Sequence, residues 1–235
     1  TEMASTILDV GCATGTTVRW LKIHGLLDPS KYLGIDLGGP VIDHAKELYP
    51  DSKFEKVRPN AIHNMSSKYH IVFSRDTILH QTDPFTFIGD LLNCCSKTLI
   101  VRLRTRDKGV TVLDENLSCQ SYAGKFWMPY IVLNIDELLD CFTSHPAVSS
   151  IEISRSYEVL GDKHGRYLPK ELYFSEAGGA ETIVKIQLSN SSSNNAPSLK
   201  FLDVLEGDKF LRNHIWKVRL IQLLDFGRNI FGKRH

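Results

Sequence analysis

The sequence lacks several features that would place it in a specialised class of proteins. Its 235 residues carry a net charge of +1, so it has no basic excess of the kind that binds nucleic acid, and we expect no such partner. No apolar run approaches the roughly 20 residues that cross a bilayer, and the first residues show no signal-peptide pattern. What is left is an ordinary globular composition, 42% hydrophobic and 23% charged, that suits one large domain.

Cysteine usage excludes two further classes. The chain has five cysteines, an odd number, and no C-x-x-C spacing. This pattern fits neither a disulfide framework nor a zinc site. We therefore expect reduced thiols and a cytoplasmic protein. The cysteines are Cys12, Cys94, Cys95, Cys119 and Cys141.

Strand-like and helix-like segments alternate along the chain, which is typical of an α/β protein whose parallel sheet is covered by helices on both faces. Pro40 suits the first turn of a helix, Asp83 suits an N-cap, and Asn134 with Glu137 matches a capping box. We expect helices over residues 16–24, 40–48, 84–93 and 134–142. We expect strands near residues 6–10, 32–36, 53–57, 69–74, 98–103, 149–159 and 181–188.

Two long segments interrupt this alternation and predict insertions, over 104–133 after the fifth strand and over 161–179 after the sixth. Residues 189–198 are rich in Ser and Asn and predict a polar linker. Residues 199–235 predict a basic, helical C-terminal extension, either packed on the domain or docked on a partner or membrane. The first strand begins almost at Thr1, so we expect a fragment of a longer polypeptide; a processed full-length protein is the alternative.

The turn after the first strand is the most informative segment. Residues 7–15 read Ile-Leu-Asp-Val-Gly-Cys-Ala-Thr-Gly, an apolar run that ends in an acidic residue and a turn bracketed by glycines. Glycine lets a backbone turn tightly and approach a small ligand at the start of a helix. A dinucleotide fold needs G-x-G-x-x-G, but Thr16 stands where the third glycine should be. The pattern D-x-G-x-A-x-G instead resembles motif I of class I S-adenosylmethionine-dependent methyltransferases, usually (D/E)-x-G-x-G-x-G.

This resemblance implies a fold and a cofactor. The fold would be Rossmann-like, with a seven-stranded, mostly parallel sheet, an antiparallel last strand and helices on both faces. The methyltransferase domain would span residues 1–188. The cofactor would be S-adenosylmethionine, which leaves as S-adenosylhomocysteine after the methyl group is transferred.

The resemblance also implies cofactor contacts. Asp36 ends the second strand, where the family uses an acidic residue to bind both ribose hydroxyls; the two oxygens of a carboxylate suit a cis-diol. Asn60 follows the third strand, where the family places a side chain near adenine, although a simple loop residue is the alternative. Asp9 would help to hold the ammonium group. The cofactor-binding set is Asp9, Gly11, Cys12, Ala13, Thr14, Gly15, Asp36, Leu37, Asn60, Ala61 and Ser74.

The candidate catalytic residues follow the fourth strand. The segment Ser-Arg-Asp-Thr-Ile-Leu-His over 74–80 resembles the motif IV region of small-molecule methyltransferases, where a polar loop faces the transferred methyl group. If this loop is one helical turn, Asp76 and His80 share a face, and Asp76 could orient and charge-stabilise His80 as a general base. We assign Arg75, Asp76 and His80 to catalysis. The alternative is structural, with a His80 hydrogen bond inside the loop and an Arg75–Asp76 ion pair.

No cluster of metal ligands stands out in the sequence, so we assign no metal site. Some sugar methyltransferases use a divalent metal, and that dependence stays open.

The acceptor must be inferred from the insertions. Their aromatic residues could stack on sugar rings or simply belong to the core. Residues 126–138 resemble a stretch of methyltransferases that tailor polysaccharides and glycans, so we expect O-methylation of a sugar or glycan hydroxyl and possible partner domains in a longer glycan-processing polypeptide. One alternative is an O-methyltransferase for a natural product or lipid-linked metabolite. The other is a catalytically inactive cofactor-binding module. The aromatic residues are Tyr122, Phe126, Trp127 and Tyr130.

Overall fold

The computed structural model describes residues 5–114, 119–122, 126–157, 166–167, 179–189 and 196–204. The helices are α1 (Thr16–Ile23), α2 (Gly39–Leu48), α3 (Pro84–Cys94) and α4 (Ile135–Thr143), with short 3-10 turns η1 (Pro29–Lys31) and η2 (Ile78–His80). The strands of the main sheet are β1 (Ile7–Val10), β2 (Tyr32–Asp36), β3 (Lys53–Lys56), β4 (Tyr69–Arg75), β5 (Cys95–Arg106), β8 (Leu133–Asn134), β9 (Val148–Tyr157), β11 (Ala180–Leu188) and β12 (Ser198–Val204).

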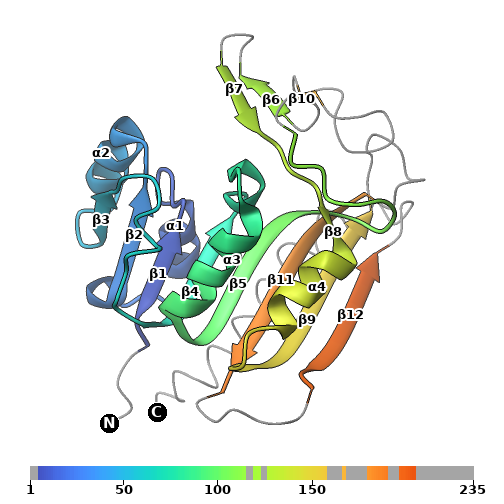
Figure 1. Ribbon diagram of the computed structural model, residues 1–235. Helices are drawn as coiled ribbons and strands as arrows, with labels where there is room; N and C mark the ends of the chain where they lie inside the picture. The colour runs from blue at the N-terminus through green and yellow to red at the C-terminus, as the bar shows by residue number, and fades with distance from the viewer. Residues whose placement is uncertain are drawn as a thin grey trace.

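The main sheet has the order β12-β9-β11-β5-β4-β1-β2-β3, and β8 pairs with the end of β5 (Figure 1). Its pairings are parallel except for those of β11, which runs antiparallel to both β5 and β9. The predicted Rossmann-like α/β fold with one antiparallel strand is therefore confirmed. The sheet has nine strands rather than the expected seven, because β8 and β12 add to it.

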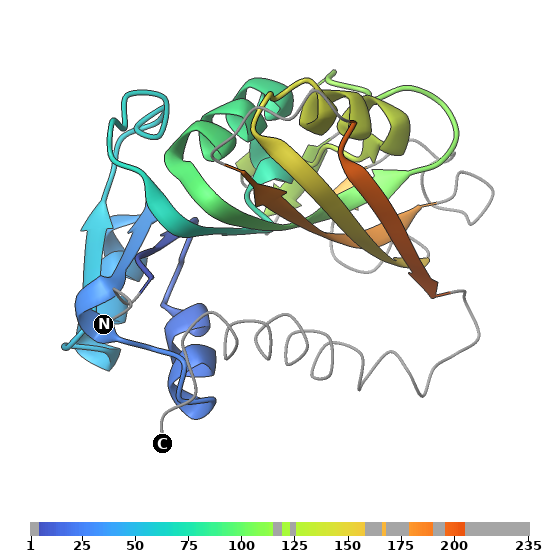
Figure 2. The same ribbon diagram turned by 90° about the horizontal axis from the view of Figure 1, so that it is seen from below.

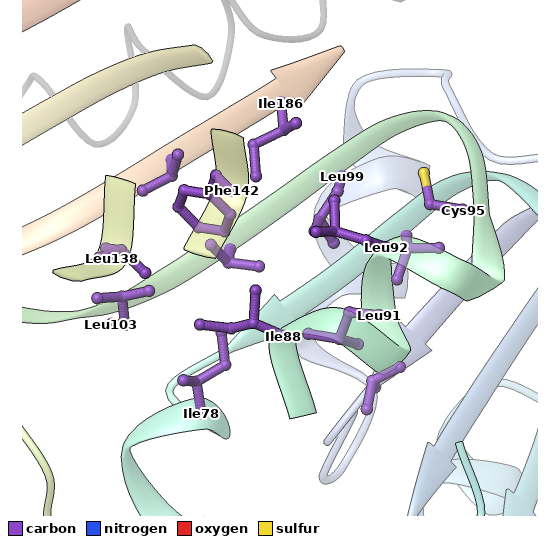
Figure 3. Packing of buried hydrophobic residues seen from close by; sticks show 14 of the residues in the cluster. Ile78, Ile88, Leu91, Leu92, Cys95, Leu99, Leu103, Leu138, Phe142 and Ile186 are labelled. Carbon is purple, nitrogen blue, oxygen red and sulfur yellow. The ribbon is translucent and has the colours of Figure 1, made fainter. Parts of the chain in front are cut away.

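Helices cover both faces of this sheet, and each covered face has its own apolar core (Figure 2). On one face, α3 and α4 bury Leu92 and Phe142 against β5 and β11, and Figure 3 shows Phe142 beside Leu138 and near Ile186. On the other face, α1 and α2 pack against β1 and β2 through a smaller cluster that includes Leu21 and Ile42. The strands are held between these two layers, so the turns at their ends occupy fixed positions.

The predicted helix starts are confirmed, with one difference. The Asp83 carboxylate accepts the N–H of Thr86 at 3.1 Å, and the Asn134 side chain accepts the N–H groups of Asp136 and Glu137 at 2.9 and 3.0 Å. The capping box expected at Asn134 is incomplete, because the Glu137 carboxylate binds the N–H of Thr111 instead of returning to Asn134. Glu137 thus ties the chain after β5 to the start of α4.

The end of the described chain corrects a second expectation. Residues 199–204 were predicted to be helical, but they belong to β12, which pairs in parallel with β9. Leu199 and Phe201 alternate with Lys200 in the period-2 pattern of a strand. Ser198, expected in the linker, begins this strand. Most of that linker and residues 205–235 lie outside the described residues.

The predicted insertion over 104–133 contains a hairpin of β6 (Cys119–Tyr122) and β7 (Phe126–Pro129), joined by β10 (Arg166–Tyr167) in a three-stranded antiparallel sheet. This hairpin stands beyond the main sheet at the top of Figure 1. Tyr130, only 2% exposed, belongs to the core rather than to an open surface. The side chains of Tyr122, Phe126 and Trp127 lie outside the described part of the chain. None of the helices within the described ranges is long and apolar enough to cross a membrane.

Candidate cofactor and catalytic site

The turns after β1, β2, β3 and β4 meet at one edge of the sheet, because parallel strands end on the same side. Direct backbone hydrogen bonds join the turn after β1 to the end of β2. The N–H groups of Gly11 and Cys12, after β1, both donate to the carbonyl oxygen of Ile35 at 2.9 and 3.1 Å. The cofactor residues predicted from separate segments are thus brought to one edge.

The glycine turn needs its two glycines for backbone and packing reasons. Gly11 and Gly15 have φ angles of 74° and 79°, in the left-handed region that L side chains disfavour. A Cβ atom on Gly11 would lie 2.0 Å from the Thr77 hydroxyl oxygen, which itself donates to the Val10 carbonyl at 3.2 Å. Thr77 therefore holds the loop after β4 against the loop after β1. No motif in the sequence predicts this contact of Thr77.

Asp36 organises the turn as well as standing at the predicted ribose position. Its Oδ2 accepts the N–H of Ala13 at 3.0 Å, and its Oδ1 accepts the N–H of Gly38 at 2.9 Å. Ala13 takes the place of the usual glycine with φ 46°, a conformation that costs an alanine about 1–2 kcal/mol. The bond from Ala13 to Asp36 offsets part of that strain. Each carboxylate oxygen keeps a further lone pair for a ligand hydroxyl.

Asp9 lies underneath the glycine turn rather than at its surface. It is 2% exposed, and its Oδ2 accepts the hydroxyl of Tyr32 at 2.7 Å. Burial raises the pKa of Asp9, while hydrogen bonds from Tyr32 and Thr17 and the charge of Arg75 act in the opposite direction. Arg75 is exposed at the end of β4, on the strand that neighbours β1.

The other predicted cofactor residues are arranged around this edge with different exposures. The Cys12 side chain is 5% exposed and packs in the core of the α1 and α2 face, where burial raises the pKa of its thiol. Cys12 can therefore offer a ligand only its backbone. Thr14, in the same turn, is partly exposed. Leu37 is 54% exposed directly after Asp36, and Ser74 is buried. Asn60 is exposed, with φ 62°, and the neighbouring Ala61 is partly buried.

Asp76 does not form the predicted pair with His80. Its φ of 56° takes it out of any helical turn, so the spacing of four residues does not place the two side chains on one face. Its Oδ2 lies 3.1 Å from Nη1 of Arg102, and its Oδ1 lies 3.6 Å from Nη1 of Arg104. The Arg75–Asp76 ion pair, which was the structural alternative, is replaced by these contacts.

Both arginines also bind Glu181. Arg102 Nη2 and Arg104 Nη2 lie 2.8 and 2.9 Å from Glu181 Oε2, so two cations and two anions form one cluster that joins β5, β11 and the loop after β4. The side chains of Arg104 and Glu181 are only 8% and 11% exposed. The cluster anchors the loop that follows β4, because the Asp76 N–H also donates to the Arg102 carbonyl at 2.9 Å.

Replacing Glu181 with glutamine is expected to lower the free energy of unfolding by about 3 kcal/mol, because removing one member of a buried ion cluster leaves uncompensated charge. Urea unfolding of both proteins measures the difference. Glu55→Gln is the matched control, since the Lys53–Glu55 pair is exposed (68% and 46%) and water screens its charges, so the change should be much smaller. Equal changes in the two variants would contradict a structural role for the cluster.

His80 binds a different partner, from the hairpin. Its Nδ1 lies 2.7 Å from the carbonyl oxygen of Pro129, at the end of β7. The N–H of Ile131 donates to the Leu79 carbonyl at 2.8 Å, and the Tyr130 ring contacts the His80 ring edge-on with centroids 6.1 Å apart. The hairpin is thereby fastened to η2 on both sides of Tyr130. His80 and Pro129 are 49 positions apart in the sequence, and no local pattern predicts their contact.

In the described ranges, no group of three His, Cys, Asp or Glu side chains is placed to hold a metal ion.

Comparisons with known proteins agree with this geometry. Residues 8–98 match a family model described as a methyltransferase domain. The chain is 29% identical over 128 residues to the candidate methyltransferase 235L of Invertebrate iridescent virus 6, covering 53% of this chain and 47% of that protein. It therefore spans about half the length of this curated relative.

Solved structures show the same fold at low sequence identity. One is the O-methyltransferase of a trans-AT polyketide multienzyme of Brevibacillus brevis with S-adenosylhomocysteine: TM-score 0.56, 13% identity, 79% of this chain and 67% of that chain. Another is an S-adenosylmethionine-dependent methyltransferase from Mesorhizobium loti: TM-score 0.52, 15% identity, 79% of this chain and 92% of that chain. The chain has the fold of these proteins.

Proposed function

We propose that this protein is an S-adenosylmethionine-dependent methyltransferase that methylates a hydroxyl group, with a sugar or glycan as the first choice of acceptor. The observation that carries the proposal is the arrangement of Asp36. Its carboxylate ends β2 at the edge where the glycine turn lies, holds that turn through Ala13, and keeps lone pairs for a ribose diol. The family match over residues 8–98 supports the same cofactor.

We assign the residues at this edge of the sheet to different parts of the cofactor. We assign Asp36 to the ribose, and the exposed Leu37 with Asn60 and Ala61 to the adenine ring. The remaining predicted positions line the turn through their backbones or support it from below. They are Gly11, Cys12, Ala13, Thr14, Gly15 and Ser74.

Asp9 and Arg75 suit the amino-acid end of the cofactor. They lie on the neighbouring strands β1 and β4, and the charge of Arg75 acts on the buried Asp9 carboxylate. A carboxylate and a guanidinium near the ends of these two strands complement the ammonium and the carboxylate group of the cofactor. Because Asp9 is buried beneath the turn, we assign it an indirect effect on the ammonium group, and we assign Arg75 to the carboxylate.

The cofactor supplies an electrophilic methyl group on a sulfonium. The protein must align the acceptor oxygen with that carbon, which is worth about 7–11 kcal/mol at best. His80, on the loop after β4, would take the hydroxyl proton, and a positioned base contributes about 10²–10⁴-fold. The ion cluster of Asp76, Arg102, Arg104 and Glu181 holds that loop in place, so we assign Asp76 to positioning.

Two observations bear on the identity of the acceptor. The resemblance of residues 126–138 to glycan-tailoring enzymes supports a sugar hydroxyl, and this segment contains β7 and leads into α4. The Brevibacillus neighbour, an O-methyltransferase of a polyketide multienzyme, supports another small molecule such as a natural product. An inactive cofactor-binding module is the remaining alternative.

Calorimetry with S-adenosylmethionine is the first test, and we expect binding to a single site. Incubation with methyl-labelled cofactor and panels of glycans and small hydroxylated molecules, read by mass spectrometry, then identifies the acceptor. A labelled glycan supports the first choice, and a labelled small molecule in its place supports the alternative. Binding without transfer to any acceptor would favour the inactive module, and absence of binding would refute the proposal.

A further inference from the structure

The environment of His80 carries an inference that rests on its proposed role as the base. Its Nδ1 lies 2.7 Å from the Pro129 carbonyl oxygen, and a carbonyl oxygen can only accept a hydrogen bond. Nδ1 must therefore carry the hydrogen. In the neutral ring the other nitrogen, Nε2, is then the unprotonated one.

We propose that the backbone carbonyl of Pro129 is the positioning group for His80: it fixes the Nδ1–H tautomer and leaves Nε2 as the atom that takes the acceptor's proton. The role that the sequence suggested for Asp76 thus falls to the end of β7. The hairpin formed by β6 and β7 becomes part of the catalytic apparatus as well as a candidate wall of the acceptor site.

Contacts on both sides hold the Pro129 carbonyl in place. Tyr130 and Ile131, which follow it, are 2% and 1% exposed, and the Ile131 N–H is bonded to the Leu79 carbonyl. The two bonds, from His80 to Pro129 and from Ile131 to Leu79, run in opposite directions between the same two segments. The Tyr130 ring packs against the imidazole edge and restricts its rotation. A backbone acceptor held this way orients a histidine without adding a negative charge.

This arrangement serves the transfer of the methyl group to the acceptor oxygen. The acceptor oxygen forms a bond to the methyl carbon while the bond from that carbon to sulfur breaks, and S-adenosylhomocysteine leaves as a neutral thioether. The hydroxyl proton passes to Nε2 of His80, which becomes an imidazolium with both nitrogens protonated. Its Nδ1–H bond to Pro129 is kept throughout, because the same hydrogen is present before and after transfer. The imidazolium then releases its Nε2 proton to water.

Nuclear magnetic resonance of the chain labelled with ¹⁵N-histidine tests the tautomer directly and needs neither cofactor nor acceptor. We expect the neutral His80 ring to show a protonated Nδ1 and an unprotonated Nε2, assigned by the signal that disappears in His80→Asn. The opposite tautomer, or the mixture given by free histidine, would overturn the inference. A protein that shows the expected tautomer but transfers no methyl group would refute the proposed function and leave this assignment intact.

Two substitutions separate positioning from proton transfer. In His80→Asn the side-chain amide can still donate to Pro129, but no atom replaces Nε2; in His80→Gln the amide reaches the Nε2 position, and the Nδ1 donor is lost. We expect hydrogen exchange at the Ile131 N–H to stay unchanged in His80→Asn and to become about fivefold faster in His80→Gln. Turnover should fall in both variants. Equal exchange rates in the two would contradict the link between His80 and the hairpin.

Discussion

Replacing Asp36 with alanine is expected to weaken S-adenosylmethionine binding by about 10²- to 10⁴-fold. Two charge-assisted hydrogen bonds to the ribose hydroxyls would be lost, each worth about 1.5–3 kcal/mol. The glycine turn would also lose the bond that holds the strained Ala13, at 3.0 Å from Asp36 Oδ2. Calorimetry on both proteins measures the change, and circular dichroism checks that the fold is kept.

A cofactor analogue separates these two contributions. S-adenosylhomocysteine lacking the ribose 2′-hydroxyl should bind the wild-type chain more weakly than the parent compound, whereas Asp36→Ala should bind both equally. Asp36→Asn is the matched control, because its amide keeps one oxygen as an acceptor and should give an intermediate loss. If the analogue and the parent compound differ equally in both proteins, Asp36 does not contact the ribose.

The strands that form the cofactor edge could be predicted because their signals are local. Tyr32–Asp36 was predicted with the boundaries that β2 has, since an apolar run there stands between a turn and the helix that Pro40 opens. Parallel strands end at one edge, so the glycine turn and Asp36 had to approach each other once the fold was known. The order and direction of the strands therefore determine which loops meet at this edge.

The contacts of the loop after β4 could not be predicted, because its partners are distant in sequence. The expected Asp76–His80 pair assumed helical geometry, and the left-handed backbone at Asp76 removes it. Arg102, Glu181 and Pro129 come from three other elements, and no spacing rule connects them to the loop. Strand β12 was missed for a different reason, since a short alternating segment was joined to a longer basic stretch that followed it.

These long-range contacts change what is expected of the two predicted catalytic residues. If Asp76 oriented His80 directly, loss of either side chain would abolish turnover alike. In the structure, Asp76 instead belongs to the cluster with Arg102 and Arg104, and the Pro129 carbonyl contacts His80. The two residues should therefore differ in their kinetic effects.

Replacing His80 with alanine is expected to lower turnover by about 10²- to 10⁴-fold, the contribution of a positioned general base. Cofactor affinity should stay within about twofold, because His80 is not among the residues assigned to the cofactor. Single-turnover transfer of labelled methyl, with binding measured in parallel by calorimetry, gives both quantities.

Asp76→Asn provides the comparison that decides between the two arrangements. Its side chain keeps an oxygen that can accept from Arg102, so the loop should stay in place and turnover should fall by less than about tenfold, a loss that fits positioning rather than proton transfer. If turnover fell as much in Asp76→Asn as in His80→Ala, Asp76 would have a direct role in catalysis. Full turnover in His80→Ala would instead remove His80 from the reaction and require another base at the edge where β4 ends.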